Sequence, residues 1–252
     1  MSQESSAPSF TEFANLGFVI ASKMVAEDRQ KVGFLYREKP MDSNDSGWRI
    51  FSGTEDQDYI DNADNSALYP IQTILEVDPS VAELLNSPTG SAFEWEDGEW
   101  FSADEFEFED DFLTDQLITA HWSITINNLF ARRVEENGDL VLTMRGRTVM
   151  IAVWNMEDQT EDEIYAYHKG LAKDRNPTDP PVIETFDMSN DELKRVGYRI
   201  QESDGVEVYQ GIYAFVIKGT QVLQLAFYYD DKEDRDWALE TWKSIQAVDP
   251  DM

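Results

Sequence analysis

Cysteine is absent from this chain of 252 residues, and histidine occurs only at His121 and His168. Without cysteine there is no disulfide, no thiolate metal ligand and no cysteine nucleophile, a composition that suits a reducing compartment. Neither histidine has a serine or metal-ligand partner at a recognised spacing. The sequence therefore predicts no catalytic residue, no metal site and no cofactor.

Long apolar runs and basic residues are also scarce. No stretch approaches the roughly 18 consecutive apolar residues of a membrane helix, and the polar start of the chain lacks the pattern of a secretory signal. We therefore expect a cytoplasmic protein. Lysine and arginine number 20 against 51 aspartates and glutamates, which leaves a net charge of −31. Such a surface repels phosphate, so we predict no binding to nucleic acid or to a membrane.

Acidic residues are abundant and concentrated in the first part of the chain. Residues 1–118 hold 26 acidic and 6 basic residues. Recognition of a basic protein and selection for solubility both explain such a surface, and the sequence leaves this choice open. We predict a flexible N-terminus over residues 1–14, one domain over 15–115 and a second over 120–248.

One segment combines acids with aromatic rings. Residues 94–115 contain eleven acids and no base, interleaved with phenylalanine and tryptophan, which disfavours disorder. The rings either pack this segment on the surface or stand exposed for a partner. Our candidate partner-binding residues are Trp95, Trp100, Phe101, Glu105, Phe106, Glu107 and Glu109.

The fold class predicted for both domains is α+β, each a mainly antiparallel sheet with packed helices. In the first domain, residues 17–20 and 32–36 are predicted strands at hairpin spacing, followed by a strand over 48–51 and short apolar segments at 71–75 and 81–85.

In the second domain, residues 140–144 and 148–154 predict a hairpin. Residues 196–201, 206–218 and 221–229 predict three more strands, the last two joined by a turn at Gly219 and Thr220. Thr160 and Glu163 predict a capping box, and Asp231 a cap for the last helix.

Several conspicuous residues also have structural explanations. Both histidines, and Trp154, Trp237 and Trp242, fit partly buried or core positions. Residues 42–47 resemble the opening of a calcium loop, but Gly53 stands where the twelfth-position glutamate belongs, so a turn is the better interpretation.

Three blocks of the first domain carry a family resemblance: GFVIASK at 17–23, VGFLYRE at 32–38 and DSGWRIFSGTE at 45–55. Over about residues 15–95 the chain resembles immunity-protein family thirty-three, formerly a domain of unknown function, which is associated with bacterial polymorphic-toxin systems. The resemblance implies a cytoplasmic protein that binds a cognate toxin.

Residues within these blocks are expected to act as scaffold. Gly47 suits a positive φ, Trp48 is predicted to pack under Arg49, and Arg37 or Arg49 to pair with Glu55 or Asp56. The full scaffold set is Arg37, Asp45, Ser46, Gly47, Trp48, Arg49, Gly53 and Glu55.

Residues of about 120–247 resemble the α/β sandwich of PsbP and DcrB-type proteins, through AFVI at 214–217 and DWALETWKSI at 236–245. Relatives of that fold include chaperones of secreted effectors. We therefore expect a non-enzymatic immunity protein that binds a basic toxin, with a chaperone or adaptor for a secreted effector as the alternative and an unrecognised hydrolase as a third class. The oligomeric state stays open.

Overall fold

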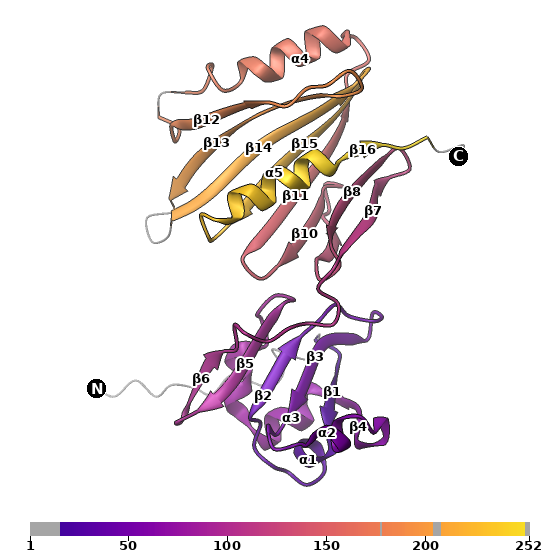
Figure 1. Ribbon diagram of the computed structural model, residues 1–252, viewed down its shortest axis with the longest axis vertical. Coiled ribbons are helices and arrows are strands. Elements are labelled where there is room, and N and C mark those ends of the chain that lie inside the picture. Colours follow the sequence, from indigo (N-terminus) through magenta and orange to yellow (C-terminus); the bar gives the residue numbers. More distant parts are fainter. Residues whose placement is uncertain (1–15, 177, 204–207, 250–252) are drawn as a thin grey trace. The chain divides into compact units, whose positions relative to one another are not determined.

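The computed structural model describes residues 16–176, 178–203 and 208–249 (Figure 1). The segment 1–14, predicted to be flexible, lies outside the described residues. The chain divides into two units, the first ending at Asp111 and the second beginning at Phe112. Both are built from mainly antiparallel sheets with a few helices, which confirms the α+β class.

The first unit contains a six-stranded sheet in the order β4-β1-β3-β2-β5-β6. All neighbours in it are antiparallel except β1 and β3, which run parallel. The strands are β1 Phe18–Ser22, β2 Phe34–Arg37, β3 Asp45–Phe51, β4 Ser66–Pro70, β5 Ser91–Glu96 and β6 Glu99–Ser102.

The predicted hairpin between the first two strands is wrong, because β3 lies between β1 and β2. The Ser22 side chain accepts a hydrogen bond from the Met24 backbone N–H at 3.2 Å and caps a short helix, α1 (Lys23–Ala26). The chain thus leaves β1 through a helix rather than a tight turn.

One face of this sheet carries the core of the first unit. Leu35, Trp48 and Ile50 are fully buried there with residues of α3 (Ile71–Val77) and of the 3-10 helix Pro79–Leu84, the two segments expected only to be apolar. The Trp48 indole N–H donates to the Leu85 carbonyl oxygen at 3.2 Å. Two short elements, α2 (Gln57–Ile60) and the 3-10 helix Ala63–Asn65, precede β4.

The second unit contains a seven-stranded antiparallel sheet, ordered β12-β13-β14-β15-β11-β10-β9, and a three-stranded sheet, ordered β16-β8-β7. The predicted hairpins are present as β10–β11 and β14–β15, the latter turning at Gly219 with φ of 58°. The strands are β7 Leu113–Thr119, β8 Trp122–Asn127, β9 Ala131–Val134, β10 Leu140–Met144, β11 Arg147–Asn155, β12 Val182–Asp187, β13 Lys194–Ser203, β14 Val208–Lys218, β15 Gln221–Tyr229 and β16 Gln246–Ala247. Residues 206 and 207 of the predicted strand 206–218 lie outside the described residues.

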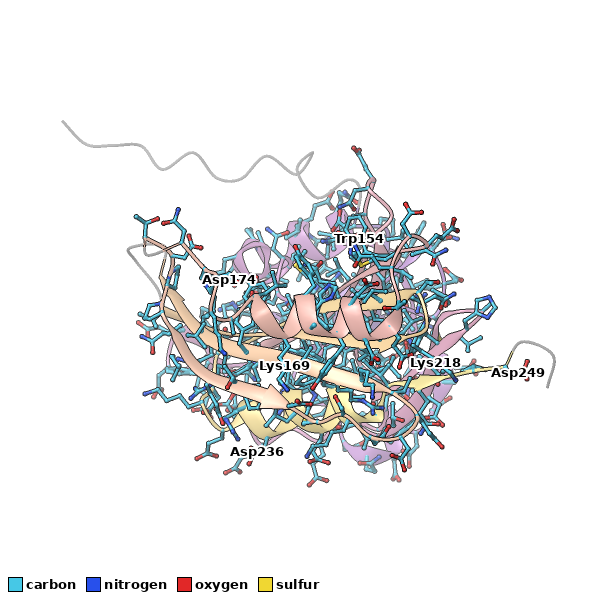
Figure 2. The ribbon with its side chains drawn as sticks, turned by 90° about the horizontal axis from the view of Figure 1, so that it is seen from above. Trp154, Lys169, Asp174, Lys218, Asp236 and Asp249 are labelled. Atoms are coloured by element: carbon cyan, nitrogen blue, oxygen red, sulfur yellow. The ribbon has the colours of Figure 1, made fainter. Side chains whose placement is uncertain are left out.

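Helices cover both faces of the large sheet. The helix α4 (Glu161–Gly170) packs on one face around Ile164, while α5 (Asp234–Ser244) and the small sheet pack on the other around Trp242 (Figures 1 and 2). The predicted capping box of Thr160 and Glu163 is present. Asp231 does not cap α5: its side chain accepts from the Glu233 N–H in the preceding turn, and the helix begins at Asp234.

Two predicted burial states are wrong. Trp154 is 56% exposed, because it lies on β11 while α4 packs mainly on β13 and β14. His121 is exposed in the turn between β7 and β8. Trp242 is buried, and Trp237 stacks on Phe130 with ring centroids 5.8 Å apart. Within the described part of the chain, none of the helices has the length and apolar character needed to cross a membrane.

Candidate functional site

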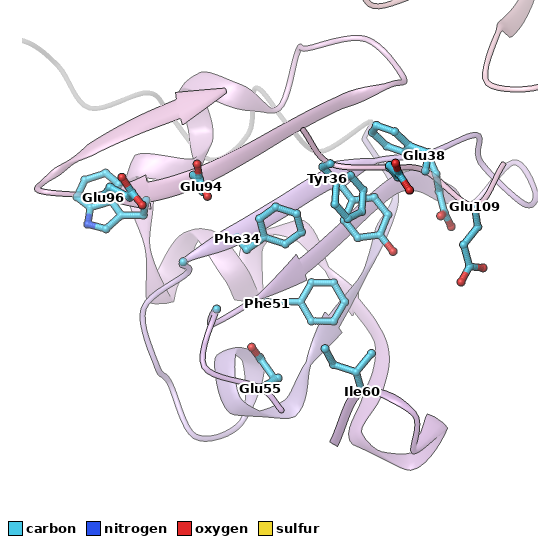
Figure 3. A pocket seen from close by; sticks show the side chains of 15 residues that line it. Phe34, Tyr36, Glu38, Phe51, Glu55, Ile60, Glu94, Glu96 and Glu109 are labelled. Atoms are coloured by element: carbon cyan, nitrogen blue, oxygen red, sulfur yellow. The ribbon is translucent and has the colours of Figure 1, made fainter. Parts of the chain in front are cut away.

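A groove of about 590 Å³ lies on the outer face of the first unit's sheet, opposite the core (Figure 3). Strands β2, β3 and β5 and the segment that follows β6 form it. Its lining consists of two glycines, Ile60, six aromatic residues and six glutamates. The aromatic residues are Phe34, Tyr36, Phe51, Trp95, Phe106 and Phe108, and the glutamates are Glu38, Glu55, Glu94, Glu96, Glu107 and Glu109.

Strand alternation places the rings of the groove floor. On β2, Leu35 points into the core, so Phe34 and Tyr36 point to the outer face. Phe34 is opposite Phe51 of β3 on one side and Glu94 of β5 on the other. The floor is therefore a row of two rings that ends at a carboxylate.

The segment after β6 forms one wall. Phe106 lies over the floor, with its ring centroid 5.1 Å from that of Phe34 and 4.7 Å from that of Tyr36. Phe108 contacts both Phe106 and Tyr36 edge-on. The sequence predicts that the acidic-aromatic segment either packs on the surface through its rings or exposes them for a partner. Phe106 packs on the surface, while Glu105 and Glu107, which alternate with the rings, are exposed.

Negative charge surrounds the rings. In Figure 3 the labelled glutamates lie around Phe34, Tyr36 and Phe51. Glu94, Glu96, Glu107 and Glu109 are exposed, and no ion pair to any of them occurs among the described residues. The lining itself holds no lysine, arginine or histidine.

Two side chains of the groove lining, Tyr36 and Glu38, have raised pKa values. Burial, followed by the charge of Glu38, raises the pKa of Tyr36 to about 12. Burial likewise raises the pKa of Glu38, although Arg49 opposes the shift. Burial therefore favours the neutral form of both side chains over the anionic form.

Beside the groove, a buried ion-pair network supports the sheet. Arg49 donates two hydrogen bonds to Asp45, at 2.9 and 2.8 Å, and one to Glu38 at 2.6 Å. Burial alone would raise the pKa of Asp45, but hydrogen bonds from Arg49 and from the Met41 and Gly47 backbone N–H groups lower it to about 2. The same bonds raise the pKa of Arg49 against the effect of burial.

The predicted pairing of Arg37 or Arg49 with Glu55 or Asp56 is wrong. Arg37 donates to the carbonyl oxygens of Ser46 and Ser87, and Glu55 accepts from the Ser52 backbone N–H at 2.8 Å. Asp56 accepts from the Tyr59 N–H as the cap of α2.

The prediction that Trp48 packs under Arg49 is wrong. Trp48 and Arg49 are neighbours on β3, so Trp48 points to the core and Arg49 to the outer face. The cation near the Trp48 ring is Arg37, 5.7 Å from the ring centroid. Gly47 and Gly53 have φ of 82° and 78°, and the Ser46 hydroxyl accepts from the Trp48 N–H.

The remaining candidates are divided between the two faces. Trp95 and Trp100 face each other across the β5–β6 hairpin, and the Trp100 indole N–H donates to the Ser80 hydroxyl on the helix side. Phe101 is 47% exposed on β6, outside the groove lining. The structure therefore brings Trp95, Phe106, Glu107 and Glu109 to the groove, but not Trp100, Phe101 or Glu105.

Sequence reasoning missed the floor residues Phe34, Tyr36 and Phe51. Their signal is the alternation of rings around Leu35 on β2, which marks a strand with apolar side chains on both faces. An apolar sheet face on the side away from the helices indicates either a segment of the chain that packs over it or a binding surface.

The turn at residues 42–47 and the His168 side chain both have local structural partners. The Asp42 side chain accepts from the backbone N–H groups of Asn44 and Asp45, which is the geometry of a turn. His168 donates from Nδ1 to the Ile164 carbonyl oxygen at 2.8 Å, and burial lowers its pKa. Within the described residues, no three potential ligands are grouped to hold a metal ion.

Comparison with known proteins finds a family match within the first unit. Residues 19–104 match the family model described as the immunity protein Imm33 domain, and this range runs from β1 to β6. No curated protein matches the chain.

Among the solved structures that resemble the chain are three with a TM-score of 0.39 each. One is a protein from Bacteroides thetaiotaomicron, at 6% identity over 52% of this chain and 46% of that one. The Ran-binding protein Mog1p of Saccharomyces cerevisiae matches at 9% identity over 56% and 97%. PsbP (CyanoP) of the cyanobacterium Synechocystis matches at 12% over 55% and 94%.

Proposed function

We propose that this protein is a cytoplasmic, non-enzymatic immunity protein that binds a cognate bacterial toxin and neutralises it. The observation that carries the proposal is the match of residues 19–104 to an immunity domain, in the same unit that bears the groove. Strands β2, β3 and β5, which lie within this match, supply the groove floor, and the wall follows the match directly, at residues 106–109.

The charge of the chain supports a basic toxin as the partner. The net charge of −31 gives the molecule a long-range attraction for a positively charged domain and speeds their encounter. The half-buried aromatic side chains of the groove, next to the acids, supply the apolar contact that holds a complex after encounter. Neutralisation then follows from occlusion of the toxin, without any reaction performed by this chain.

The experiment is co-expression of the full chain with the toxin domain encoded beside its gene. We expect growth to be restored, and the purified chain to form a stable complex with a catalytically inactive version of that toxin. Size-exclusion chromatography and calorimetry measure the complex. Failure to bind any adjacent toxin, or a complex in which the toxin stays active, would refute the proposal.

A chain that instead stabilises a secreted effector by binding a non-catalytic segment would act as a chaperone. In that case deletion of this gene would lower effector abundance while toxicity in the co-expression assay would persist, which also contradicts the immunity role.

A further inference from the structure

The floor of the groove offers aromatic faces at close spacing. Tyr36 and Phe51 are stacked almost in parallel, with their planes at 10° and centroids 6.1 Å apart. Phe106 lies against Tyr36 from the wall side. The π faces of aromatic rings attract cations, and most strongly where water is partly excluded, as it is for these half-buried side chains.

The rim adds carboxylates within the same lining. Glu94 ends the row of floor rings, and Glu107 alternates with the wall rings. Neither carboxylate has an ion-pair partner among the described residues. An anionic ligand would be repelled by the rim, and a purely apolar ligand would leave the rim carboxylates without a partner.

One contact between a cation and a ring is already present at the edge of the groove. The ammonium group of Lys31 lies 3.1 Å from the centroid of the Trp95 ring. Trp95 contributes to the groove lining, whereas Lys31 does not. A cation is therefore accommodated on a ring at one end of the site, and the central rings Tyr36 and Phe51 have no lysine or arginine over them among the described contacts.

We propose that the groove binds an arginine side chain carried on an extended segment of the toxin, with the guanidinium group over the floor rings and paired with a rim glutamate. Arginine fits better than lysine because its planar group stacks on a ring and forms two parallel hydrogen bonds with a carboxylate. The volume of about 590 Å³ accommodates a side chain together with its flanking residues. This inference rests on the proposed function for the identity of the partner.

The direct test uses the full chain and a blocked pentapeptide, serine-leucine-arginine-leucine-serine, titrated in two-dimensional NMR experiments. We expect resonances of Phe34, Tyr36, Phe51 and Phe106 to shift. A peptide with citrulline in place of arginine keeps the shape without the charge and should bind roughly tenfold more weakly. Equal affinity for the two peptides, or shifts confined to other surfaces, would overturn the inference.

Two pairs of variants test the two parts of the inference. The first pair asks whether binding depends on the rim carboxylates or on the overall negative charge, and the second asks whether it depends on an aromatic ring of the groove. The double variant Glu94→Gln with Glu107→Gln should weaken the arginine peptide roughly tenfold, while Glu76→Gln with Glu83→Gln, which removes two exposed acids on the helix side, should not. Phe106→Leu keeps apolar volume and should weaken binding several-fold, whereas Phe101→Leu, outside the groove, should leave it unchanged. Matching losses in test and control variants would contradict the assignment.

Measurements with the toxin distinguish this inference from the function on which it rests. If the toxin is neutralised but the Glu94→Gln with Glu107→Gln variant binds it as tightly as the parent chain, the groove is not the contact and only the inference fails. If the arginine peptide binds in the groove but no toxin is neutralised, the proposed function fails. The inference predicts a parallel loss of affinity for the peptide and for the toxin.

Discussion

Arg49 binds Asp45 with two parallel hydrogen bonds, Nη1 to Oδ1 at 2.9 Å and Nη2 to Oδ2 at 2.8 Å, within one strand. Both side chains are buried, and Glu38 completes the partners of the guanidinium group. A buried charge that loses its partner is costly, because neither water nor another group replaces the lost bonds. This pair therefore controls the stability of the first unit, directly beside the groove.

Asp45→Asn should lower the free energy of unfolding of the first unit by about 3 kcal/mol, because the positive charge of Arg49 would then be only partly balanced. Urea denaturation followed by tryptophan fluorescence measures the change. Glu83→Gln is the control, since it removes an exposed carboxylate of the same unit and should change stability by less than about 0.5 kcal/mol. Equal stability of the two variants would show that the pair contributes nothing.

Acid should destabilise the same unit through Asp45. Its pKa is about 2 in the folded chain against an ordinary value of 3.8, so protonation favours unfolding. The stabilisation is fully present above about pH 4 and is lost as the pH falls toward 2, with a total of about 2 kcal/mol. Many other carboxylates titrate in this range, so the measurement is the difference between the parent chain and Asp45→Asn. That difference should shrink as the pH falls, and a constant difference would contradict the assignment.

Gly47→Ala should disrupt the start of β3. Gly47 has φ of 82°, and an added Cβ would lie 2.2 Å from the Glu38 carbonyl oxygen, which is fixed by its position next to β2. Gly98 has φ of 97° but no atom within 4 Å of such a Cβ. We expect a loss of about 1 kcal/mol for Gly98→Ala from the backbone alone, and of more than about 3 kcal/mol for Gly47→Ala. Thermal unfolding of the two variants checks this, and similar melting temperatures would refute the clash.

Local signals explain which parts of the fold the sequence predicts. The turn at Gly219, the positive φ of Gly47 and the capping box at Thr160 depend on a few neighbouring residues, and all three are present. The parallel pairing of β1 with β3 depends on contacts between segments far apart in the chain, which no local pattern specifies. The predicted burial of Trp154 is wrong for a related reason, since the exposure of its side chain depends on where α4 packs.

The candidate site shows the same division. The acidic-aromatic composition of residues 94–115 drew attention to Phe106 and Glu107, which the structure places in the groove lining. The floor rings Phe34 and Tyr36 come from a strand about seventy residues earlier, and their outward direction follows only once Leu35 is known to face the core. The sequence contains the ring alternation, but the fold decides which face stays open.

The capping box of α4 provides a test in the second unit. The Thr160 side chain accepts from the Glu163 backbone N–H, and Glu163 accepts in return from the Thr160 backbone N–H at 2.9 Å. Thr160→Ala removes the first bond and should lower the free energy of unfolding by about 1 kcal/mol. Thr160→Ser keeps the hydroxyl and serves as the control, with an expected change of less than about 0.5 kcal/mol.

Hydrogen exchange of the amides in the first turn of α4 shows whether the effect lies at the cap. Faster exchange there in the alanine variant alone is expected, because the bond that closes the first turn would be missing. Equal exchange in both variants would show that packing around Ile164, rather than the cap, fixes the start of this helix.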